Sequence, residues 1–338
     1  MNFANHGLLG IFQLFTLVHF LNIIVVSLKD GGKALNINQI YDELSLQIDK
    51  NRMILNAPMK EYTSFKAGGN AALLVQPENV EELSYALKVV SEREVKHLVI
   101  GNGSNLLIKD SGYQGVILRI GEPFQEINVT SDRIEAGAGV LLSIAAKEAC
   151  KASLTGFEFA GGIPGSIGGA VFMNAGAYDG EISQIIESAE VMSKDGSCVF
   201  SLNKKELDLS YRHSILQTTG DILLKATFLL EKGDSEKINA RMKELSARRI
   251  EKQPLSYPSA GSFFKRPHNH FAGKLIQDSG LSGLSLGGAQ VSPLHAGFII
   301  NTGGATATDI IDLMEVVRNT VFEEFGILLE PEVRIIGE

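Results

Sequence analysis

The sequence has few of the residues that form disulfides and metal sites. It contains only two cysteines in 338 residues, Cys150 and Cys198, and their separation matches no metal-ligand spacing. A chain of this length buries a large enough core to fold without a disulfide, so both thiols suit a reducing cytosol. Among seven histidines, only His268 and His270 lie close together. We therefore expect no metal site.

The chain also lacks an excess of positive charge. Its 31 Lys and Arg residues against 39 Asp and Glu residues give a net charge of −8. A general nucleic-acid-binding protein needs a basic surface to displace counterions, so we exclude that class of protein. A local cationic pocket for a phosphorylated small molecule stays compatible with this balance. The hydrophobic content of 44% and charged content of 21% are ordinary for a soluble enzyme of two or three domains.

One long hydrophobic run lies near the N-terminus, in residues 7–27. It is long enough to span a membrane, but it has neither the basic start nor the cleavage site of a signal peptide. Lys29 and Lys33 follow it and would keep the rest of the chain in the cytoplasm if it inserted. The alternative is an upstream extension from a wrongly chosen start codon. In either case we expect a cytoplasmic protein whose only membrane contact, if it has one, is through residues 7–27.

Glycine is abundant and is densest in residues 161–170, which read GGIPGSIGGA. Glycine at this density costs folding entropy, so we expect it where the backbone turns sharply or approaches something closely. The interleaved Ile and Ala residues differ from the composition of a flexible linker. We interpret the segment as backbone that presents N–H groups to a flat or phosphorylated ligand. The alternative is a loop that crosses a crowded core.

A second glycine turn, Gly101-Asn102-Gly103-Ser104-Asn105, follows a predicted strand. A Rossmann site would need a third glycine where this chain has Leu106, and no helix is predicted to begin there. The turn can still bind a pyrophosphate through its N–H groups and hydroxyls. Together with residues 161–170, it suggests two loops that enclose one long ligand.

Apolar periodicity and capping signals predict the main elements. We expect helices over 37–49, from Asn79 past Val90, over 141–152, over 235–252 and from Thr306 to about 325, and strands over 72–75, 97–100, 115–120, 133–138, 189–192, 222–230 and 327–336. The irregular alternation of short helices and strands favours an α+β fold over one doubly wound sheet. A change in composition places a domain boundary near residue 232.

Three further segments carry candidate catalytic groups. Arg212 follows Tyr211, and its guanidinium can grip a carboxylate at two points. Ser262 precedes two phenylalanines and Lys265, which places a hydroxyl in an aromatic setting beside positive charge. Glu332 lies in the predicted final strand. Each segment also has a plain structural interpretation: a surface arginine, core phenylalanines, and an exposed ion pair between Glu332 and the residue two positions later.

Six segments in this order resemble the UDP-N-acetylenolpyruvoylglucosamine reductases. They are YTSFKAGGN at 62–70, GNGSN at 101–105, the glycine-rich run at 161–178, YRHS at 211–214, GSFFK at 261–265 and LEPEVR at 329–334. The resemblance covers about residues 36–338. The short interval between Ser214 and Ser259 resembles the shorter form of the enzyme, because the longer form carries a tyrosine-bearing loop there.

The resemblance implies an α+β fold with a vanillyl-alcohol-oxidase/PCMH-type FAD-binding domain followed by a smaller α+β substrate-binding domain. The implied limits are an apolar extension at 1–35, a lead-in at 36–66, the FAD-binding domain at 67–231, the substrate-binding domain at 232–326 and a C-terminal strand with a catalytic glutamate at 327–338. The extension lies outside the family pattern.

The activity implied is reduction of the enolpyruvyl group of UDP-N-acetylglucosamine enolpyruvate to UDP-N-acetylmuramate, a cytoplasmic step of peptidoglycan precursor synthesis. FAD is the implied bound cofactor and NADPH the implied hydride donor. Arg212 is expected to hold and polarise the substrate carboxylate, Glu332 to assist, and Ser262 to donate the proton. The expected partners are the UDP-sugar substrate and NADPH, and we expect no binding of nucleic acid. We also expect a monomer.

The resemblance and the two glycine loops also suggest binding residues. The expected cofactor contacts are Gly101, Asn102, Gly103, Ser104, Asn105, Gly162, Ile163, Pro164, Gly165, Gly168, Gly169, Asn174 and Gly176. The expected substrate contacts are Tyr211, Lys265, Arg266 and Gln290. Some members of the family have asparagine at the position of Arg266, so the role of this residue stays open.

Two alternatives remain at this stage. Another flavin enzyme of the same fold, such as a hydroxy-acid oxidase or dehydrogenase, would share the glycine loops but would not need residues 261–265 and 329–332. A catalytically silent UDP-sugar-binding or membrane-tethered scaffold protein would need neither Arg212, Ser262 nor Glu332.

Overall fold

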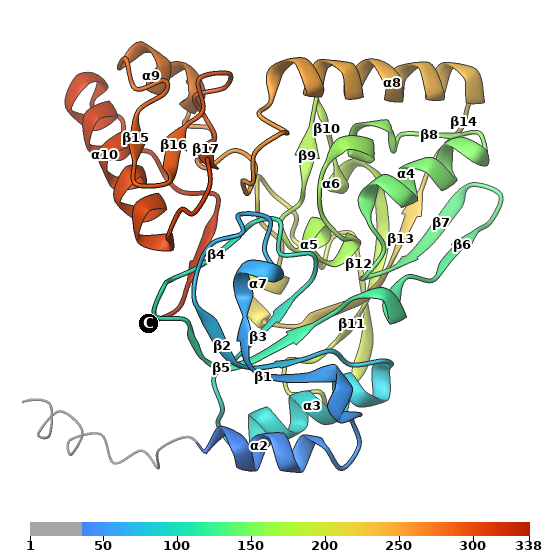
Figure 1. Ribbon diagram of the computed structural model, residues 1–338. Coiled ribbons are helices and arrows are strands. Elements are labelled where there is room, and N and C mark those ends of the chain that lie inside the picture. Colours follow the sequence, from blue (N-terminus) through green and yellow to red (C-terminus); the bar gives the residue numbers. More distant parts are fainter. Residues whose placement is uncertain (1–35) are drawn as a thin grey trace, which may run out of the picture. The chain divides into compact units, whose positions relative to one another are not determined.

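The computed structural model describes residues 36–338 (Figure 1). The predictions made for residues 1–35, including the apolar run at 7–27, lie outside the described residues. Within residues 36–338, no helix combines the length and the apolar character that a membrane crossing requires.

The first sheet is mixed and has the strand order β1-β2-β5-β3. Its strands are β1 (Met53–Pro58), β2 (Asn70–Val75), β3 (His97–Ile100) and β5 (Tyr113–Arg119). β5 is parallel to both β2 and β3, whereas β1 is antiparallel to β2. Residues 73–75 and 116–118 are buried without alternation, as expected for strands that are covered on both faces. Helices α2 (Ile37–Leu44) and α3 (Val80–Glu92) lie beside this sheet (Figure 1).

The second sheet is antiparallel, with the order β12-β11-β13-β7-β6. Its strands are β6 (Ile127–Val129), β7 (Arg133–Gly137), β11 (Ile186–Met192), β12 (Val199–Asn203) and β13 (Ile222–Leu229). Helices α4 (Leu142–Lys151) and α5 (Ile167–Phe172) pack against it. The main core joins both sheets and these helices, through residues such as Leu73, Leu118, Ala146 and Phe228.

A second core lies in the C-terminal part. It contains α9 (Ala272–Asp278), α10 (Ala307–Phe325) and the antiparallel strands β15 (Ser285–Leu286), β16 (Ala289–Val291) and β17 (Ile299–Asn301). Phe65 and Leu107, from the N-terminal half, are buried in the same cluster as Phe263. β18 (Arg334–Ile336) pairs in parallel with β4 (Leu106–Ile108). The chain therefore returns at its end to the segment that follows the first glycine turn.

The capping signals of two helices are confirmed. The Asn79 side chain accepts a hydrogen bond from the Glu82 N–H at 2.8 Å and begins α3. Thr306 and Asp309 form a capping box at the start of α10, and Gly326 ends that helix with φ of +68°. Asp110, from the N-terminal half, also accepts hydrogen bonds from the first N–H groups of α10, at Ala307 and Thr308.

Helix α8 (Ser235–Lys252) has the predicted bounds. It packs against α4 and the 3₁₀ helix Glu158–Gly162, and Met242 packs on the main core. α8 thus follows residue 232 in sequence but lies with the elements that precede it (Figure 1). The domain limits 67–231 and 232–326 stay a prediction.

Two predicted elements are shorter than expected. The helix predicted over 37–49 ends at Leu44, because tighter turns over 45–48 bury Ile48 before Asp49 begins a 3₁₀ helix. The strand predicted over 327–336 spans only Arg334–Ile336, because the preceding residues pair with a different partner: Pro331 forms a bridge with Phe264.

The glycine-rich segment is partly helical, since α5 begins at Ile167 within it. The remaining short elements are α6 (Ile182–Ile185), α7 (Leu216–Thr219), β8 (Leu154–Thr155), β9 (Gly176–Ala177), β10 (Gly180–Glu181) and β14 (Glu231–Lys232).

Candidate active site

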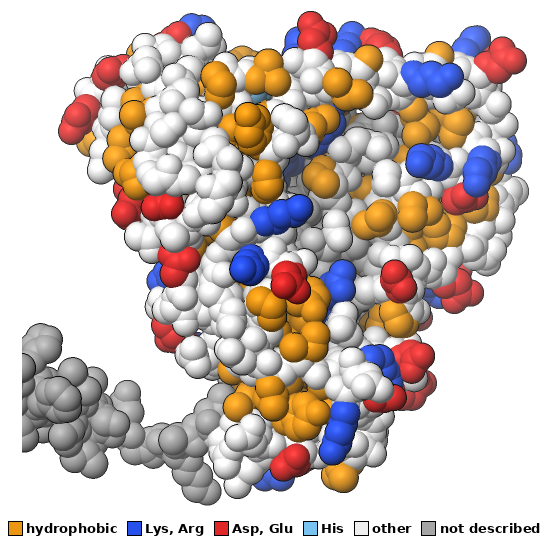
Figure 2. Space-filling model, viewed as in Figure 1, with side chains coloured by type: hydrophobic (Ala, Val, Ile, Leu, Met, Phe, Trp, Pro, Cys, Tyr) orange, Lys and Arg blue, Asp and Glu red, His pale blue; other side chains and the backbone are white. Residues whose placement is uncertain are grey.

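Two cavities meet at the predicted catalytic residues. The larger cavity has a volume of about 880 Å³, and the smaller one about 410 Å³. Arg212, Ser262 and Glu332 line both cavities. In Figure 2 the surface is hollowed between the part that carries α9 and α10 and the part beneath α8, with Lys and Arg side chains in and below the hollow. The structure thus brings the three predicted catalytic residues together from distant parts of the chain.

Most predicted cofactor contacts line the larger cavity. These are Gly101, Asn102, Gly103, Ser104, Asn105, Ile163, Pro164, Gly165, Gly168, Gly169 and Gly176. Two of the glycines lie very close to other protein atoms. Gly103 has φ of +63°, and a Cβ there would lie 2.0 Å from the Tyr62 carbonyl oxygen. At Gly101 a Cβ would lie 2.3 Å from Oγ of Ser166. The missing side chains let two backbone segments approach each other and the cavity.

The polar groups of this cavity fit a dinucleotide cofactor such as FAD. Oγ of Ser166 is buried without a hydrogen-bond partner among the described residues, and Ser166 lines the cavity. A buried hydroxyl in this state is costly unless a ligand completes its bonding. A Cβ added at Gly169 would meet no atom of residues 36–338 within 4 Å, so this glycine borders open space. The larger cavity therefore offers a ligand both exposed backbone at Gly169 and the unpaired hydroxyl of Ser166.

Two predicted cofactor contacts lie outside the cavity lining. Asn174 is fully buried, and its side chain donates to the Ser210 carbonyl at 2.9 Å and accepts from the Ser183 N–H at 2.9 Å. It therefore supports the loop that carries Arg212. Gly162 lies beneath Arg249, since a Cβ at Gly162 would be 3.0 Å from Cδ of that arginine.

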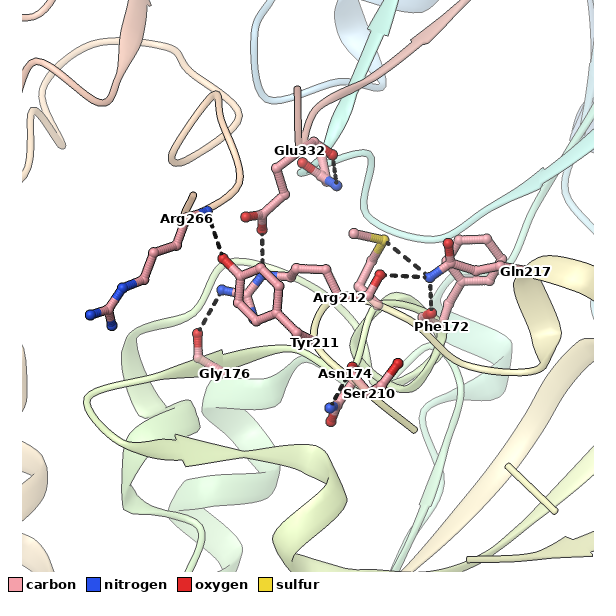
Figure 3. Close-up of polar contacts among 11 residues, drawn as sticks. Phe172, Asn174, Gly176, Ser210, Tyr211, Arg212, Gln217, Arg266 and Glu332 are labelled. Carbon is pink, nitrogen blue, oxygen red and sulfur yellow. Dashed lines mark hydrogen bonds and ion pairs between the residues drawn. The ribbon is translucent and has the colours of Figure 1, made fainter. Parts of the chain in front are cut away.

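Arg212 is held at the junction of the two cavities (Figure 3). Its Nε donates to Oε1 of Glu332 at 2.7 Å, and its Nη2 donates to the Gly176 carbonyl at 3.3 Å. The guanidinium also lies over the Tyr211 ring, 4.9 Å from its centre. The backbone of Arg212 has φ of +56°, which is uncommon for a residue other than glycine. The Gln217 side chain stabilises this turn by donating to the Arg212 carbonyl at 3.0 Å.

Glu332 is positioned by its backbone. Its N–H donates to the Phe263 carbonyl at 2.8 Å, and its carbonyl accepts from Nδ2 of Asn105 at 3.0 Å. Burial raises the pKa of the Glu332 carboxyl, although Arg212 and, more weakly, Lys265 oppose the shift. A carboxyl with a raised pKa beside a guanidinium can hold or release a proton within the site.

The segment that carries Ser262 runs beside Glu332. The Phe263 N–H donates to the Gly297 carbonyl at 2.8 Å, and Phe264 bridges to Pro331. These bonds fix Ser262 between the C-terminal core and the segment that carries Glu332. Phe263 and Phe264 are buried, so the interpretation of these two residues as part of the core is confirmed.

The predicted substrate contacts divide into two groups. Tyr211 and Arg266 line the smaller cavity, where the Tyr211 hydroxyl accepts from the Arg266 N–H at 2.9 Å. Lys265 lines neither cavity, and its Nζ lies 3.4 Å from Oε2 of Glu330. Gln290 lies on β16, where its Nε2 donates to Ser285 Oγ at 2.9 Å, away from both cavity linings. The structure therefore does not bring Gln290 to the site.

The larger cavity is also lined by polar residues that were not identified from the sequence as binding groups, among them Arg249, Gln253 and Arg334. The Arg334 guanidinium lies over the Phe172 ring, 4.8 Å from its centre, and burial lowers its pKa. In the sequence, only the position of Arg334 two residues after Glu332 indicated that Arg334 could lie near the site. Arg249 and Gln253 come from the charged helix α8, which carries no recognisable motif. Within residues 36–338, no group of three or more His, Cys, Asp or Glu side chains could hold a metal ion.

Comparisons with known proteins identify the two halves of the chain. Residues 71–200 match the family model described as FAD binding domain, and residues 253–336 match the model described as UDP-N-acetylenolpyruvoylglucosamine reductase, C-terminal domain. The predicted α+β fold with a vanillyl-alcohol-oxidase/PCMH-type FAD-binding domain is thereby confirmed.

Curated relatives are similar over most of the chain. The UDP-N-acetylenolpyruvoylglucosamine reductase of Clostridium botulinum (strain Alaska E43 / Type E3) is 52% identical over 90% of this chain and 100% of its own length. That of Clostridium novyi (strain NT) is 49% identical over 90% of this chain and 98% of its own length. The crystal structure of the Thermus caldophilus reductase has 37% identity, with a TM-score of 0.71 over 84% of this chain and 97% of that one. On this evidence the chain belongs to the UDP-N-acetylenolpyruvoylglucosamine reductase family.

Proposed function

We propose that this chain reduces the enolpyruvyl group of UDP-N-acetylglucosamine enolpyruvate to give UDP-N-acetylmuramate, with Arg212, Ser262 and Glu332 as its catalytic residues. The observation that carries the proposal is that these three residues line both cavities. A cofactor in the larger cavity and a substrate in the smaller one would meet only there. The larger cavity would hold FAD, which supplies hydride to the substrate after its own reduction by NADPH.

Arg212 binds the substrate carboxylate. Its Nε is used by Glu332, which leaves donors at the end of the guanidinium for a carboxylate. When hydride reaches the terminal vinyl carbon, negative charge develops on the adjacent carbon and on this carboxylate. A guanidinium already fixed by Glu332, Gly176 and Tyr211 stabilises that charge without having to reorganise.

Ser262 completes the reaction by donating a proton to the adjacent carbon. A serine hydroxyl is a weak acid, so it acts only toward a strongly basic carbanion and with positive charge nearby. Arg212 supplies that charge at the junction, and Lys265 lies three residues further along the chain. Glu332 orients Arg212 and keeps its guanidinium directed at the substrate carboxylate.

The neighbours of this site support a substrate with a charged nucleotide arm. Tyr211 and Arg266 extend from the junction into the smaller cavity, and Arg266 stacks on Phe271 with its guanidinium carbon 4.0 Å from the ring centre. Aromatic and cationic groups together suit a uracil and a diphosphate. We also propose that the enzyme acts in the cytoplasm, where NADPH and the nucleotide sugar are found, and as a monomer.

The test is a spectroscopic one. The purified protein should show the absorption of oxidised flavin, lose it on anaerobic addition of NADPH, and regain it when UDP-N-acetylglucosamine enolpyruvate is added. A protein without flavin absorption would favour the binding or scaffold alternative. A flavin that NADPH reduces but the enolpyruvyl substrate does not reoxidise would favour a different flavin enzyme.

A further inference from the structure

Two polar side chains at the end of α8 reach the larger cavity, and neither belongs to the catalytic set. Arg249 lies in the last turn of the helix, and Gln253 follows as its C-cap. The Gln253 N–H donates to the Arg249 carbonyl at 2.9 Å, so the two residues lie one helical turn apart. Residues with this spacing share one face of a helix. Both line the larger cavity.

Residues 36–338 satisfy neither side chain. Oε1 of Gln253 is buried and has no hydrogen-bond partner among the described residues. Burial lowers the pKa of Arg249, and no carboxylate within residues 36–338 offsets this effect. An unpaired buried acceptor and an unpaired desolvated cation are both costly. A ligand that lowers this cost must offer an acceptor to Arg249 and a donor to Gln253.

Gly162 gives Arg249 its route to the cavity. A Cβ at Gly162 would lie 3.0 Å from Cδ and 3.4 Å from Nη1 of Arg249. The arginine side chain therefore crosses the start of the glycine-rich segment where that segment has no side chain. Gly162 thus makes room for the Arg249 side chain and need not contact a ligand itself.

The chemistry of the pair distinguishes between parts of a nucleotide ligand. A phosphate presents only acceptors near neutral pH, so it would satisfy Arg249 but would pair with Gln253 only if the amide turned its Nε2 into the place of Oε1. A cyclic imide edge presents a carbonyl acceptor beside an N–H donor and satisfies both. The flavin ring of FAD and the uracil ring of the substrate each carry such an edge.

The position of the pair favours the flavin ring. Gly162, which lies against Arg249, ends the 3₁₀ helix 158–162, and this helix packs against β9 (Gly176–Ala177). The Gly176 carbonyl accepts a hydrogen bond from Arg212. The pair therefore lies toward the catalytic end of the cavity that the glycine turns enclose, where the reactive part of the cofactor is required.

We propose that Arg249 and Gln253 bind the imide edge of the flavin ring, with Arg249 donating to the C2 carbonyl and Gln253 accepting from the N3–H. The proposal rests on the proposed function, because it takes FAD as the occupant of the larger cavity. A guanidinium beside this edge stabilises the electron-rich reduced ring. Arg249 is accordingly a positioning and tuning residue for the cofactor.

The test compares Arg249→Met and Gln253→Leu with the control Arg248→Met. Arg248 is the adjacent residue of the same helix, and its Nη2 pairs with Glu244 at 2.6 Å instead of lining either cavity. We expect each test variant to bind FAD about ten- to a hundredfold more weakly than the parent, by fluorescence titration. Arg249→Met should also lower the reduction potential of the bound flavin. Arg248→Met should leave both properties unchanged.

A modified cofactor tests the Gln253 contact separately. N3-methyl-FAD cannot donate to Gln253, so the parent should bind it more weakly than FAD, whereas Gln253→Leu should bind both equally. If Arg249→Met fails to fold, Arg249→Lys provides the comparison: it should keep a potential near that of the parent but lose affinity for FAD.

Three outcomes separate the possibilities. Unchanged FAD affinity and potential in both test variants, with flavin bound normally by the parent, would overturn this inference alone. Weaker binding of UDP with unchanged FAD binding would assign the pair to uracil and would also overturn it. A parent protein that binds no FAD would instead overturn the proposed function.

Discussion

Nε of Arg212 lies 2.7 Å from Oε1 of Glu332, although the two residues are 120 positions apart in the sequence. Arg212 reaches this place from a turn with φ of +56°, a conformation that costs about 1–3 kcal/mol for a residue other than glycine. Asn174, Gln217 and Tyr211 each contact this turn or its guanidinium. The protein thus fixes the direction of one guanidinium before any substrate binds.

The first prediction concerns the proton donor. Ser262→Ala should accept hydride from NADPH at nearly the parent rate, because protonation of the substrate comes later. Reoxidation of the flavin by the enolpyruvyl substrate should slow by about a hundred- to ten-thousandfold. Stopped-flow absorbance measures the two steps separately. Ser256→Ala is the matched control, because Ser256 is exposed and lines neither cavity. Equal reoxidation rates in Ser262→Ala and the parent would assign the proton to another group.

The second prediction concerns the geometry of Arg212. Arg212→Lys keeps the positive charge but cannot donate to Glu332 and to a carboxylate together in the same planar arrangement. We expect the Kd of the substrate to rise about tenfold or more and reoxidation to slow, with flavin reduction unchanged. Isothermal titration and stopped-flow measurements test the two effects. Arg241→Lys, at an exposed ion pair on α8, should match the parent in both.

The third prediction tests whether a ligand lies against the glycine-rich segment. A Cβ at Gly169 would meet no atom of the described residues within 4 Å and borders the larger cavity, so we expect Gly169→Leu to fold normally but to exclude the cofactor. Gly121→Leu is the control, because Gly121 also has open space around it yet does not line the larger cavity. The flavin content per purified protein, with circular dichroism as the folding check, gives the result. Full flavin content in Gly169→Leu would show that the backbone there does not approach the cofactor.

The fourth prediction follows from the raised pKa of Glu332, which burial causes and Arg212 opposes. The folded state binds this proton more readily than the unfolded chain does. The resulting stability is therefore fully present below the ordinary pKa of a glutamate, and it is lost as the pH rises through the raised folded-state value. Glu332→Gln cannot titrate and should lack this loss.

Urea denaturation of both proteins between about pH 4 and 8 tests this linkage. The unfolding free energy of Glu332→Gln, relative to the parent, should increase with pH across that window and then level off. Glu332→Gln also loses the ion pair with Arg212, which changes its unfolding free energy by a constant amount. The quantity to compare is therefore the change with pH of the difference in unfolding free energy between the two proteins. A difference that stays constant with pH would mean that the carboxyl is not shifted in the folded protein.

The sequence predicted those parts of the site whose chemistry is visible in single short segments. Arg212, Ser262 and Glu332 each stand within a distinctive motif, and the glycine turns could be identified by composition alone. The long charged helix and the capped helix α10 were also predictable, because capping and periodicity are local properties.

The remaining features depend on contacts between distant segments. Arg249 and Gln253 lie on a helix of ordinary composition, and only the packing of α8 against residues 158–162 brings them to the cavity. Asn174 was expected to contact the cofactor, but its side chain is buried outside the cavity lining and is hydrogen-bonded to Ser210 and Ser183. The final strand was predicted too long, because the sequence does not reveal where a segment changes pairing partner.

Asn105 joins the first glycine turn to the last strand through two hydrogen bonds. Its side chain donates to the Glu332 carbonyl, and its own carbonyl accepts from the Arg334 N–H at 3.0 Å. A movement of residues 101–105 is therefore transmitted to the backbone of Glu332, whose carboxylate binds Arg212. An inhibitor that displaced residues 101–105 would therefore shift the Glu332 carboxylate from a distance, without occupying the smaller cavity.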